Sequence, residues 1–165
     1  MKKNFLILIL VSFLITNCAS SPQIERTQLQ IRAIQTRTYE ISESKLVLKA
    51  VLNVLQDDGF IVTTAVPEIG LLTATKEIDV ERMSESMPAY FFGGANARWK
   101  KNSIIEATCN ISFFEDKCKV RVNFAQKILD NLGGIIKIRQ IYDQRFYQTF
   151  FTKLDKSIYI QRMGL

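Results

Sequence analysis

The sequence predicts an α+β fold, a single domain in which an antiparallel sheet carries two helices on one face. Several segments alternate apolar and polar residues, as strands with one buried face do. Two longer segments, one ending before Gly59 and one beginning after Asp143, instead repeat apolar residues every three or four positions, as helices do. We expect the order β-α-β-β-loop-β-β-β-α over residues 33–165.

The first half of this domain is predicted from its strand and helix signals. Residues 33–41 alternate like a half-buried strand, and Ser42 then stands where a helix N-cap belongs. The helix runs to Asp58 and ends at Gly59, which can adopt the left-handed conformation. Its polar residues form only a narrow stripe, so we expect most of its surface to be buried. A hairpin follows, with its turn at residues 67–70.

The periodicity is then lost over a long loop at about residues 79–101. A loop of this length within a compact domain is either functional or flexible. Exposed aromatic and methionine side chains bind partner grooves or lipid headgroups, although the same side chains could simply cover the sheet. The candidate partner or membrane contacts are Met87, Tyr90, Phe91, Phe92 and Trp99.

The clearest pattern predicts a long hairpin that turns at Glu115 and Asp116. In this register Phe113 lies opposite Cys118, Cys109 opposite Val122 and Ala107 opposite Phe124, all on the face that we expect to be core. The two cysteines then lie about 13 Å apart along the ladder, whereas a disulfide needs Cα atoms within roughly 7 Å. We therefore expect no disulfide between Cys109 and Cys118, even in an oxidising compartment.

A last strand and a closing helix complete the predicted domain. The strand begins at Ile135, after a glycine-containing turn, and Asp143 is the predicted N-cap of the helix. Four apolar residues recur at four-residue spacing along this helix, with Phe151 beside them. The predicted buried residues of this face are Phe146, Phe150, Leu154 and Ile158.

The N-terminus has the layout of a secretory signal peptide over residues 1–17, with two lysines before an apolar run too short to cross a bilayer. The tetrapeptide ITNC at residues 15–18 resembles the lipobox of bacterial lipoproteins, in which the cysteine becomes a lipidated N-terminus. Asn17 departs from the small residue usual before that cysteine. The resemblance implies that Cys18 is lipidated and that residues 18–32 form a flexible tether. Because neither Ala19 nor Ser20, the two residues directly after Cys18, is acidic, the sorting pattern of enteric lipoproteins implies an outer-membrane protein facing the periplasm.

The composition excludes several functions. The chain contains no histidine, which removes histidine-based catalysis and imidazole metal sites. Its formal net charge of +6 is spread along the sequence, without the clustered basic face that binds nucleic acid. Ser42 and Lys45 match the S-x-x-K pattern of penicillin-recognising enzymes, but the partner motifs of that site are missing and ordinary helix capping explains them better. We expect no enzymatic activity, cofactor or metal.

Four strings together resemble a largely uncharacterised family of small Gram-negative lipoproteins, from about Gln35 to Gln161. They are QTRTYE, LQDDGF, GLLTATKE and YQTFFTKLDKSIYI. The order of elements also resembles, at the level of topology, the repeated domains of a lipoprotein component of the outer-membrane β-barrel assembly machinery. The resemblance implies a framework and no catalytic residues. The sequence therefore predicts a non-catalytic envelope lipoprotein that binds or braces another envelope component. The alternative is a carrier of an apolar ligand held in a cavity between helix and sheet.

Overall fold

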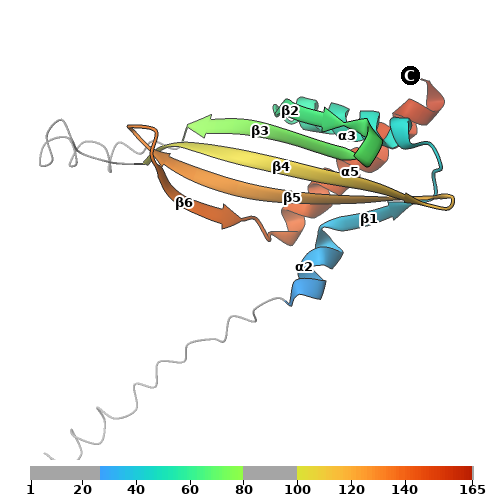
Figure 1. Ribbon diagram of the computed structural model, residues 1–165, viewed down its shortest axis with the longest axis horizontal. Helices are drawn as coiled ribbons and strands as arrows, with labels where there is room; N and C mark the ends of the chain where they lie inside the picture. The colour runs from blue at the N-terminus through green and yellow to red at the C-terminus, as the bar shows by residue number, and fades with distance from the viewer. Residues whose placement is uncertain (1–26, 80–99, 165) are drawn as a thin grey trace, which may run out of the picture.

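The computed structural model describes residues 27–79 and 100–164 and confirms the α+β class (Figure 1). A six-stranded antiparallel sheet carries helices packed against it. The elements are, in chain order, α2 (Gln28–Ile34), β1 (Thr36–Tyr39), α3 (Ser44–Asp57), β2 (Ile61–Val66), the 3-10 turn η2 (Pro67–Ile69), β3 (Leu71–Asp79), β4 (Lys100–Phe114), β5 (Lys117–Asp130), β6 (Ile135–Gln140) and α5 (Gln144–Met163).

Strand β5 holds the sheet together. The strands lie in the order β1-β5-β4-β3-β2, and β6 also pairs with β5. Strand β1 pairs with residues 118–121 of β5 and β6 pairs with residues 125–129, so both lie along the same edge of β5 (Figure 1). Segments from the two ends of the domain thus share one strand.

The β4–β5 hairpin has the predicted register. Phe113 lies opposite Cys118, Cys109 opposite Val122 and Ala107 opposite Phe124. The turn places Glu115 at φ +55°. The even alternation of polar and apolar residues determines this register, because a slip of one residue would turn every core side chain into solvent. Both cysteines are consequently buried as free thiols at separate positions of the ladder.

Helices α3 and α5 pack on the inner face of the sheet, behind it in the view of Figure 1. Helix α5 begins as predicted, because Asp143 Oδ1 accepts hydrogen bonds from the backbone N–H groups of Arg145 at 2.7 Å and Phe146 at 3.2 Å. The largest side chains of the core that are completely or almost completely buried are Tyr147, Phe124, Leu55, Leu72, Leu154, Val47, Val51, Val120 and Val122.

The buried Tyr147 hydroxyl joins three parts of the fold. It donates a hydrogen bond to the Ile141 carbonyl at 3.0 Å. It also accepts from Gln35 Nε2 and from the Phe124 N–H, both at 3.3 Å. A buried hydroxyl needs such partners, since an unpaired one would lose the hydrogen bonds that it makes to water when exposed.

The structure corrects three local predictions near the N-terminus. The segment that we expected to be tether and strand is helical at Gln28–Ile34, with Ile31 buried and Thr27 as a capping-box residue. The first strand accordingly starts at Thr36. The N-cap of α3 is Glu43, without a side-chain cap hydrogen bond, and Ser42 precedes it.

One residue of the predicted α5 core face is not buried. Phe146 keeps 36% of its surface exposed, against 4% for Phe150, 0% for Leu154 and 5% for Ile158. The four-residue spacing was therefore correct for the helix face, but this face is not covered along its whole length.

We expect Phe150→Ala to lower the free energy of unfolding by about 3–5 kcal/mol, because it empties a buried aromatic site. Urea denaturation followed by circular dichroism would measure this change. Phe114→Ala is the matched control, since Phe114 is 76% exposed and should change stability by less than about 0.5 kcal/mol. Equal effects of the two substitutions would contradict the packing of α5 described above.

Candidate functional site

A cleft of about 470 Å³ opens between the N-terminal half of α5 and the inner face of the sheet. This volume lies within the range of roughly 300–1,000 Å³ that small-molecule sites occupy. Its lining residues come from the connection between α3 and β2 (Asp58, Phe60), from the strands (Lys76, Ile78, Ile105, Phe124) and from α5 with its cap (Asp143, Arg145, Phe146, Thr149, Phe150, Lys153).

The floor of the cleft is aromatic, with Phe124 at its centre. The Phe124 ring lies edge-on to Phe146 with centroids 4.8 Å apart, and to Phe150 at 5.5 Å. The centroid of the Phe60 ring lies 6.1 Å from that of Phe124. These distances are typical of favourable aromatic pairs, so the floor is well packed while the Phe146 ring still faces the opening.

The mouth of the cleft carries three cations and two carboxylates, and both carboxylates are engaged. Asp58 forms an ion pair with Lys153, and Asp143 caps α5. Lys76 Nζ donates to the Asp58 main-chain carbonyl at 2.6 Å and lies 5.9 Å from the centroid of the Phe60 ring. The Arg145 side chain makes no hydrogen bond or ion pair with the described residues. Lys76 and Arg145, the two side chains at the mouth that form no ion pair with a described carboxylate, are therefore both positively charged.

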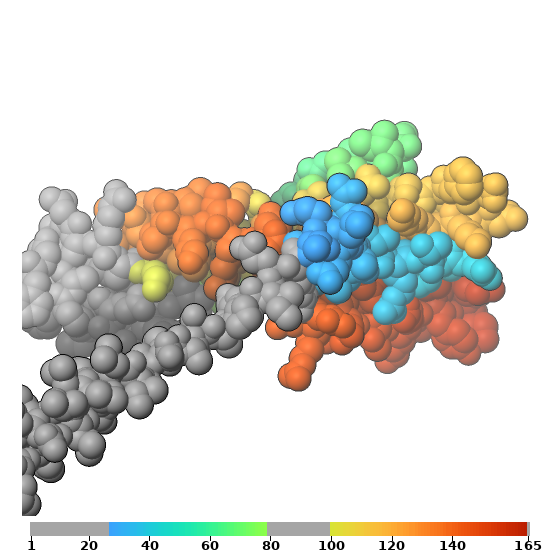
Figure 2. All heavy atoms as spheres, turned by 90° about the horizontal axis from the view of Figure 1, so that it is seen from below, coloured from blue at the N-terminus to red at the C-terminus, as the bar shows by residue number. Residues whose placement is uncertain are grey.

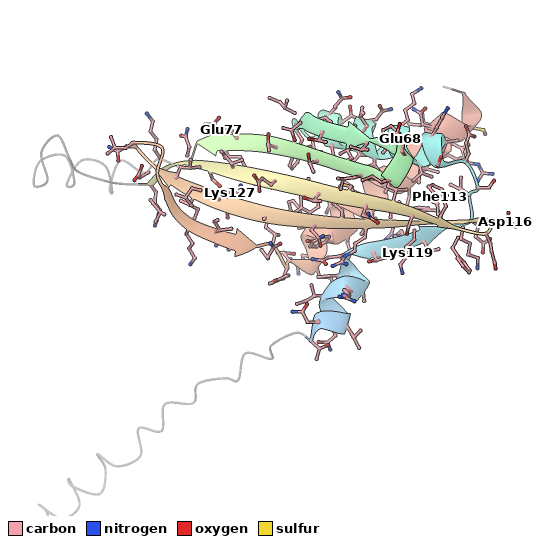
Figure 3. All side chains as sticks on the ribbon, viewed as in Figure 1. Glu68, Glu77, Phe113, Asp116, Lys119 and Lys127 are labelled. Carbon is pink, nitrogen blue, oxygen red and sulfur yellow. The ribbon has the colours of Figure 1, made fainter. Side chains whose placement is uncertain are left out.

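Strand β6 forms a second candidate surface, a sheet edge that is free among the described residues and carries three exposed isoleucines. Ile135, Ile136 and Ile138 keep 58%, 49% and 57% of their surface exposed. In the space-filling view the orange segment that contains β6 reaches the surface (Figure 2). It adjoins the end of the sheet marked by Glu77 and Lys127, opposite the β4–β5 turn with Phe113 and Asp116 (Figure 3). Exposed apolar edge strands readily pair with other strands, and native proteins usually protect them.

The backbone of β6 also presents groups that pair with no other described strand. The Ile141 N–H donates to the Phe124 carbonyl at 2.9 Å, directly after β6. Counting back from this bond shows which β6 residues hydrogen-bond to β5. Along antiparallel strands, pairs that exchange backbone hydrogen bonds alternate with pairs that do not. Ile138 and Gln140 belong to the pairs that do not bond to β5. Their N–H and carbonyl groups consequently point toward the free edge.

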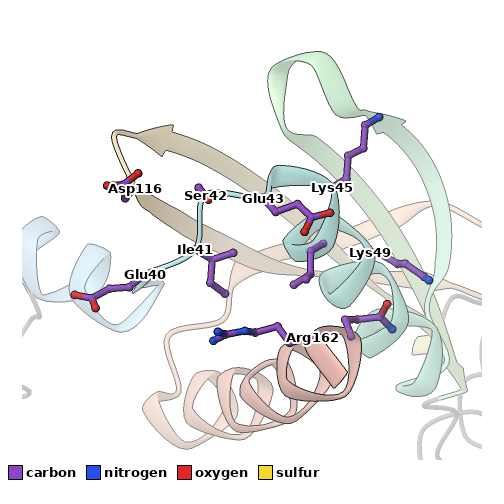
Figure 4. Close-up of a pocket in the computed structure, with 10 residues that line it drawn as sticks. Glu40, Ile41, Ser42, Glu43, Lys45, Lys49, Asp116 and Arg162 are labelled. Atoms are coloured by element: carbon purple, nitrogen blue, oxygen red, sulfur yellow. The ribbon is translucent and has the colours of Figure 1, made fainter. Parts of the chain in front are cut away.

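A polar hollow of about 720 Å³ lies where the β1–α3 connection meets the β4–β5 turn and the C-terminal end of α5 (Figure 4). It brings Ser42 and Lys45 of the S-x-x-K pattern into one depression. It also contains the acids Glu40, Glu43 and Asp116 and the bases Lys49 and Arg162. No hydrogen bond or ion pair joins these side chains to one another, so they form no catalytic relay in the part of the chain that the structure describes.

Burial changes the acidity of several groups. Burial raises the pKa of the Cys109 thiol to about 12 and that of Cys118 to about 11. It also raises the pKa of the Tyr147 hydroxyl. The pKa of Tyr39 is raised by burial and by the neighbouring Asp155 carboxylate. These groups therefore stay protonated at neutral pH, and both thiols are poor nucleophiles.

The residues predicted to contact a membrane or partner lie outside the described residues. They are the lipidation site Cys18 and the loop residues Met87, Tyr90, Phe91, Phe92 and Trp99. Within residues 27–79 and 100–164, no helix has the length and apolarity needed to cross a membrane. The same ranges contain no cluster of three or more acidic or cysteine side chains placed to hold a metal ion.

A cavity between helix and sheet was expected only as an alternative, and neither the residues that line the cleft nor the exposed β6 edge was predicted from the sequence. The string IIKI in β6 could have indicated the exposed edge, because its three isoleucines do not follow the strict alternation of a strand with one buried face. Such a pattern suits a strand with apolar side chains on both faces. The cleft had no comparable signal, since its residues come from β3, β4, β5, α5 and the connection between α3 and β2, which are far apart in the sequence.

The fold and these two surfaces define an α+β domain with an aromatic cleft and a free apolar sheet edge. No family model matches the sequence, and no curated protein matches it. Among solved structures, it is similar to the crystal structure of a DUF4468 family protein from Bacteroides ovatus, at 8% sequence identity and a TM-score of 0.39. The match covers 74% of this chain and 84% of that chain.

We expect the protein to lose stability as the pH rises from about 8.5 toward 11. The unfolded thiols release their protons near pH 8.5 whereas the folded thiols keep them, so the unfolded state binds fewer protons over this range and is favoured. Urea midpoints at pH 7.5 and pH 10 would measure the loss. Cys109→Ala should make the difference between the two midpoints smaller, and an unchanged difference would show that this thiol does not contribute.

Proposed function

We propose that this chain is a lipid-anchored, non-catalytic domain of the Gram-negative envelope that faces the periplasm and binds or braces another envelope protein. The observation that carries the proposal is the free β6 edge with Ile135, Ile136 and Ile138 exposed. An unprotected apolar edge is a hazard for a protein that acts alone, and a useful surface for one that adds a partner strand.

The side chains of β6 favour a particular kind of partner. Successive residues of a strand point to opposite faces, so Lys137 and Arg139 share one face and Ile138 lies on the other. Arg139 Nε donates to Gln126 Oε1 at 2.7 Å, which places the cationic side on the inner face of the sheet. A partner strand with acidic residues on one face and apolar residues on the other would complement β6. A second copy of β6 would instead bring like charges together.

A second candidate function is a carrier of an apolar ligand, and the aromatic cleft of about 470 Å³ favours it. The cleft is open at the surface rather than enclosed in the core, where α3 residues such as Val47 and Val51 fill the space against the sheet. The two functions use different surfaces and can be tested separately.

We expect Cys18→Ala to abolish the incorporation of labelled palmitate, because Cys18 is the only cysteine in the predicted lipobox. Several acyl chains are needed for stable anchoring, since one chain binds a membrane only marginally. Cys109→Ala is the control and should incorporate palmitate normally, because this thiol is buried in the sheet. Palmitate retained in the Cys18 variant would contradict the lipid anchor.

We expect a photocrosslinking amino acid at Ile136 to capture the partner in native cells. The same amino acid at Ile61, which is 73% exposed on the opposite edge strand β2, should not. Capture should be lost with Ile138→Pro, which removes an N–H from the free edge, and kept with Ile138→Thr, which retains it. The folded state should survive both substitutions, because Ile138 does not donate to β5. Capture that persists in the proline variant would contradict strand addition.

A further inference from the structure

The cleft exists because the two helices cover different lengths of the sheet. Ser157 Oγ donates to the Ala50 carbonyl at 3.2 Å and Lys153 pairs with Asp58, which shows that α3 and α5 run side by side in opposite directions. Helix α3 ends at Asp57, beside the middle of α5. The first two turns of α5 therefore cover the sheet without a neighbouring helix in the described chain.

Because α3 is shorter, apolar side chains at the start of α5 remain exposed in the cleft. Phe146 occupies the same face of α5 as the buried Phe150 and Leu154, yet its ring remains open to the cleft. Below it lie the ring of Phe124 and the side chain of Ile105. An aliphatic chain placed on these rings would bury apolar surface that is otherwise in contact with water.

The mouth of the cleft adds a preference of charge. Lys76 and Arg145 lie on opposite sides of the opening, on β3 and α5, and neither forms an ion pair with a described carboxylate. Asp58 and Asp143 are already bound to Lys153 and to the backbone of α5. An anionic group is therefore the complement of this mouth, since a cation would meet two uncompensated positive charges.

We propose that the cleft binds an amphipathic anion with a single aliphatic chain, the chain lying on Phe124, Phe146 and Ile105 and the anionic head pairing with Arg145 and Lys76. This ligand class rests on the second candidate function, the carrier. The anionic head is the carboxylate of a free fatty acid or the phosphate of a lysophospholipid, because both ligands have one aliphatic chain and charged oxygens at its polar end.

The test uses the full chain in its own membranes and a twelve-carbon fatty acid with a diazirine on its chain. After illumination, mass spectrometry of peptides should find the label in the peptides that contain Ile105 or Phe146. The corresponding alcohol, which lacks the charge, should label these peptides about tenfold less efficiently. Label confined to residues 1–26, or equal labelling by acid and alcohol, would overturn the proposal.

Two pairs of variants on α5 locate the anionic head and the aliphatic chain. Arg145→Gln should raise the half-saturating probe concentration about tenfold, whereas Arg162→Gln, in the last turn of α5, should leave it unchanged. Phe146→Ser should weaken labelling, and Tyr159→Ser, at a residue 60% exposed on the same helix, should not. Equal responses within either pair would overturn the assigned position.

A further experiment distinguishes a carboxylate ligand from a lipid phosphate, and tests separately whether the protein acts as a carrier. A lysophospholipid with the same diazirine would label the cleft if the bound anion is a lipid phosphate, whereas labelling by the free acid alone would identify a carboxylate ligand. Either result supports the anion site, and the absence of cleft labelling by both probes overturns it. A protein that labels in the cleft but extracts no lipid from vesicles would retain the site and lose the carrier function.

Discussion

The packing of α5 on strand β5 is the contact on which the rest of the structure depends. Strand β5 pairs with β1, β4 and β6, so its position determines that of half the sheet. The Phe124 ring contacts the rings of Phe146, Tyr147 and Phe150 on α5. The Tyr147 hydroxyl then binds the backbone on both sides of this contact. The buried core and the aromatic cleft follow from where α5 lies.

Much of the fold could be predicted from the sequence because its information is local. The alternation in β4 and β5 determines which side chains share a face, and the short turn at Glu115 and Asp116 then leaves one register. The cap at Asp143 likewise depends on two backbone N–H groups that immediately follow it. The Cys109 and Cys118 positions follow from the same register without further information.

The remainder depends on relations between distant segments, which periodicity does not record. The spacing placed Phe146 on the inner face of α5 correctly, but its exposure depends on where α3 ends beside α5. The exposure of β6 depends on its being the last strand on its side of β5. Helix α2 has only seven residues, too few to show a helical period, and it is held by a capping box and by the burial of Ile31.

The short β1 ladder has a mechanical consequence. A pull applied through the N-terminal segment reaches the domain at α2 and then β1, which pairs with β5 over only four residues. Its main reinforcements are the Arg37–Asp155 ion pair at 2.6 Å, the Tyr39 hydroxyl bond to Asp155 at 3.0 Å and the Arg37 guanidinium 4.9 Å from the Phe151 ring. The much longer β4–β5 ladder bears load only after these contacts. Under tension the domain would therefore lengthen first by peeling β1 from the sheet, while its core, its cleft and the β6 edge stayed in place.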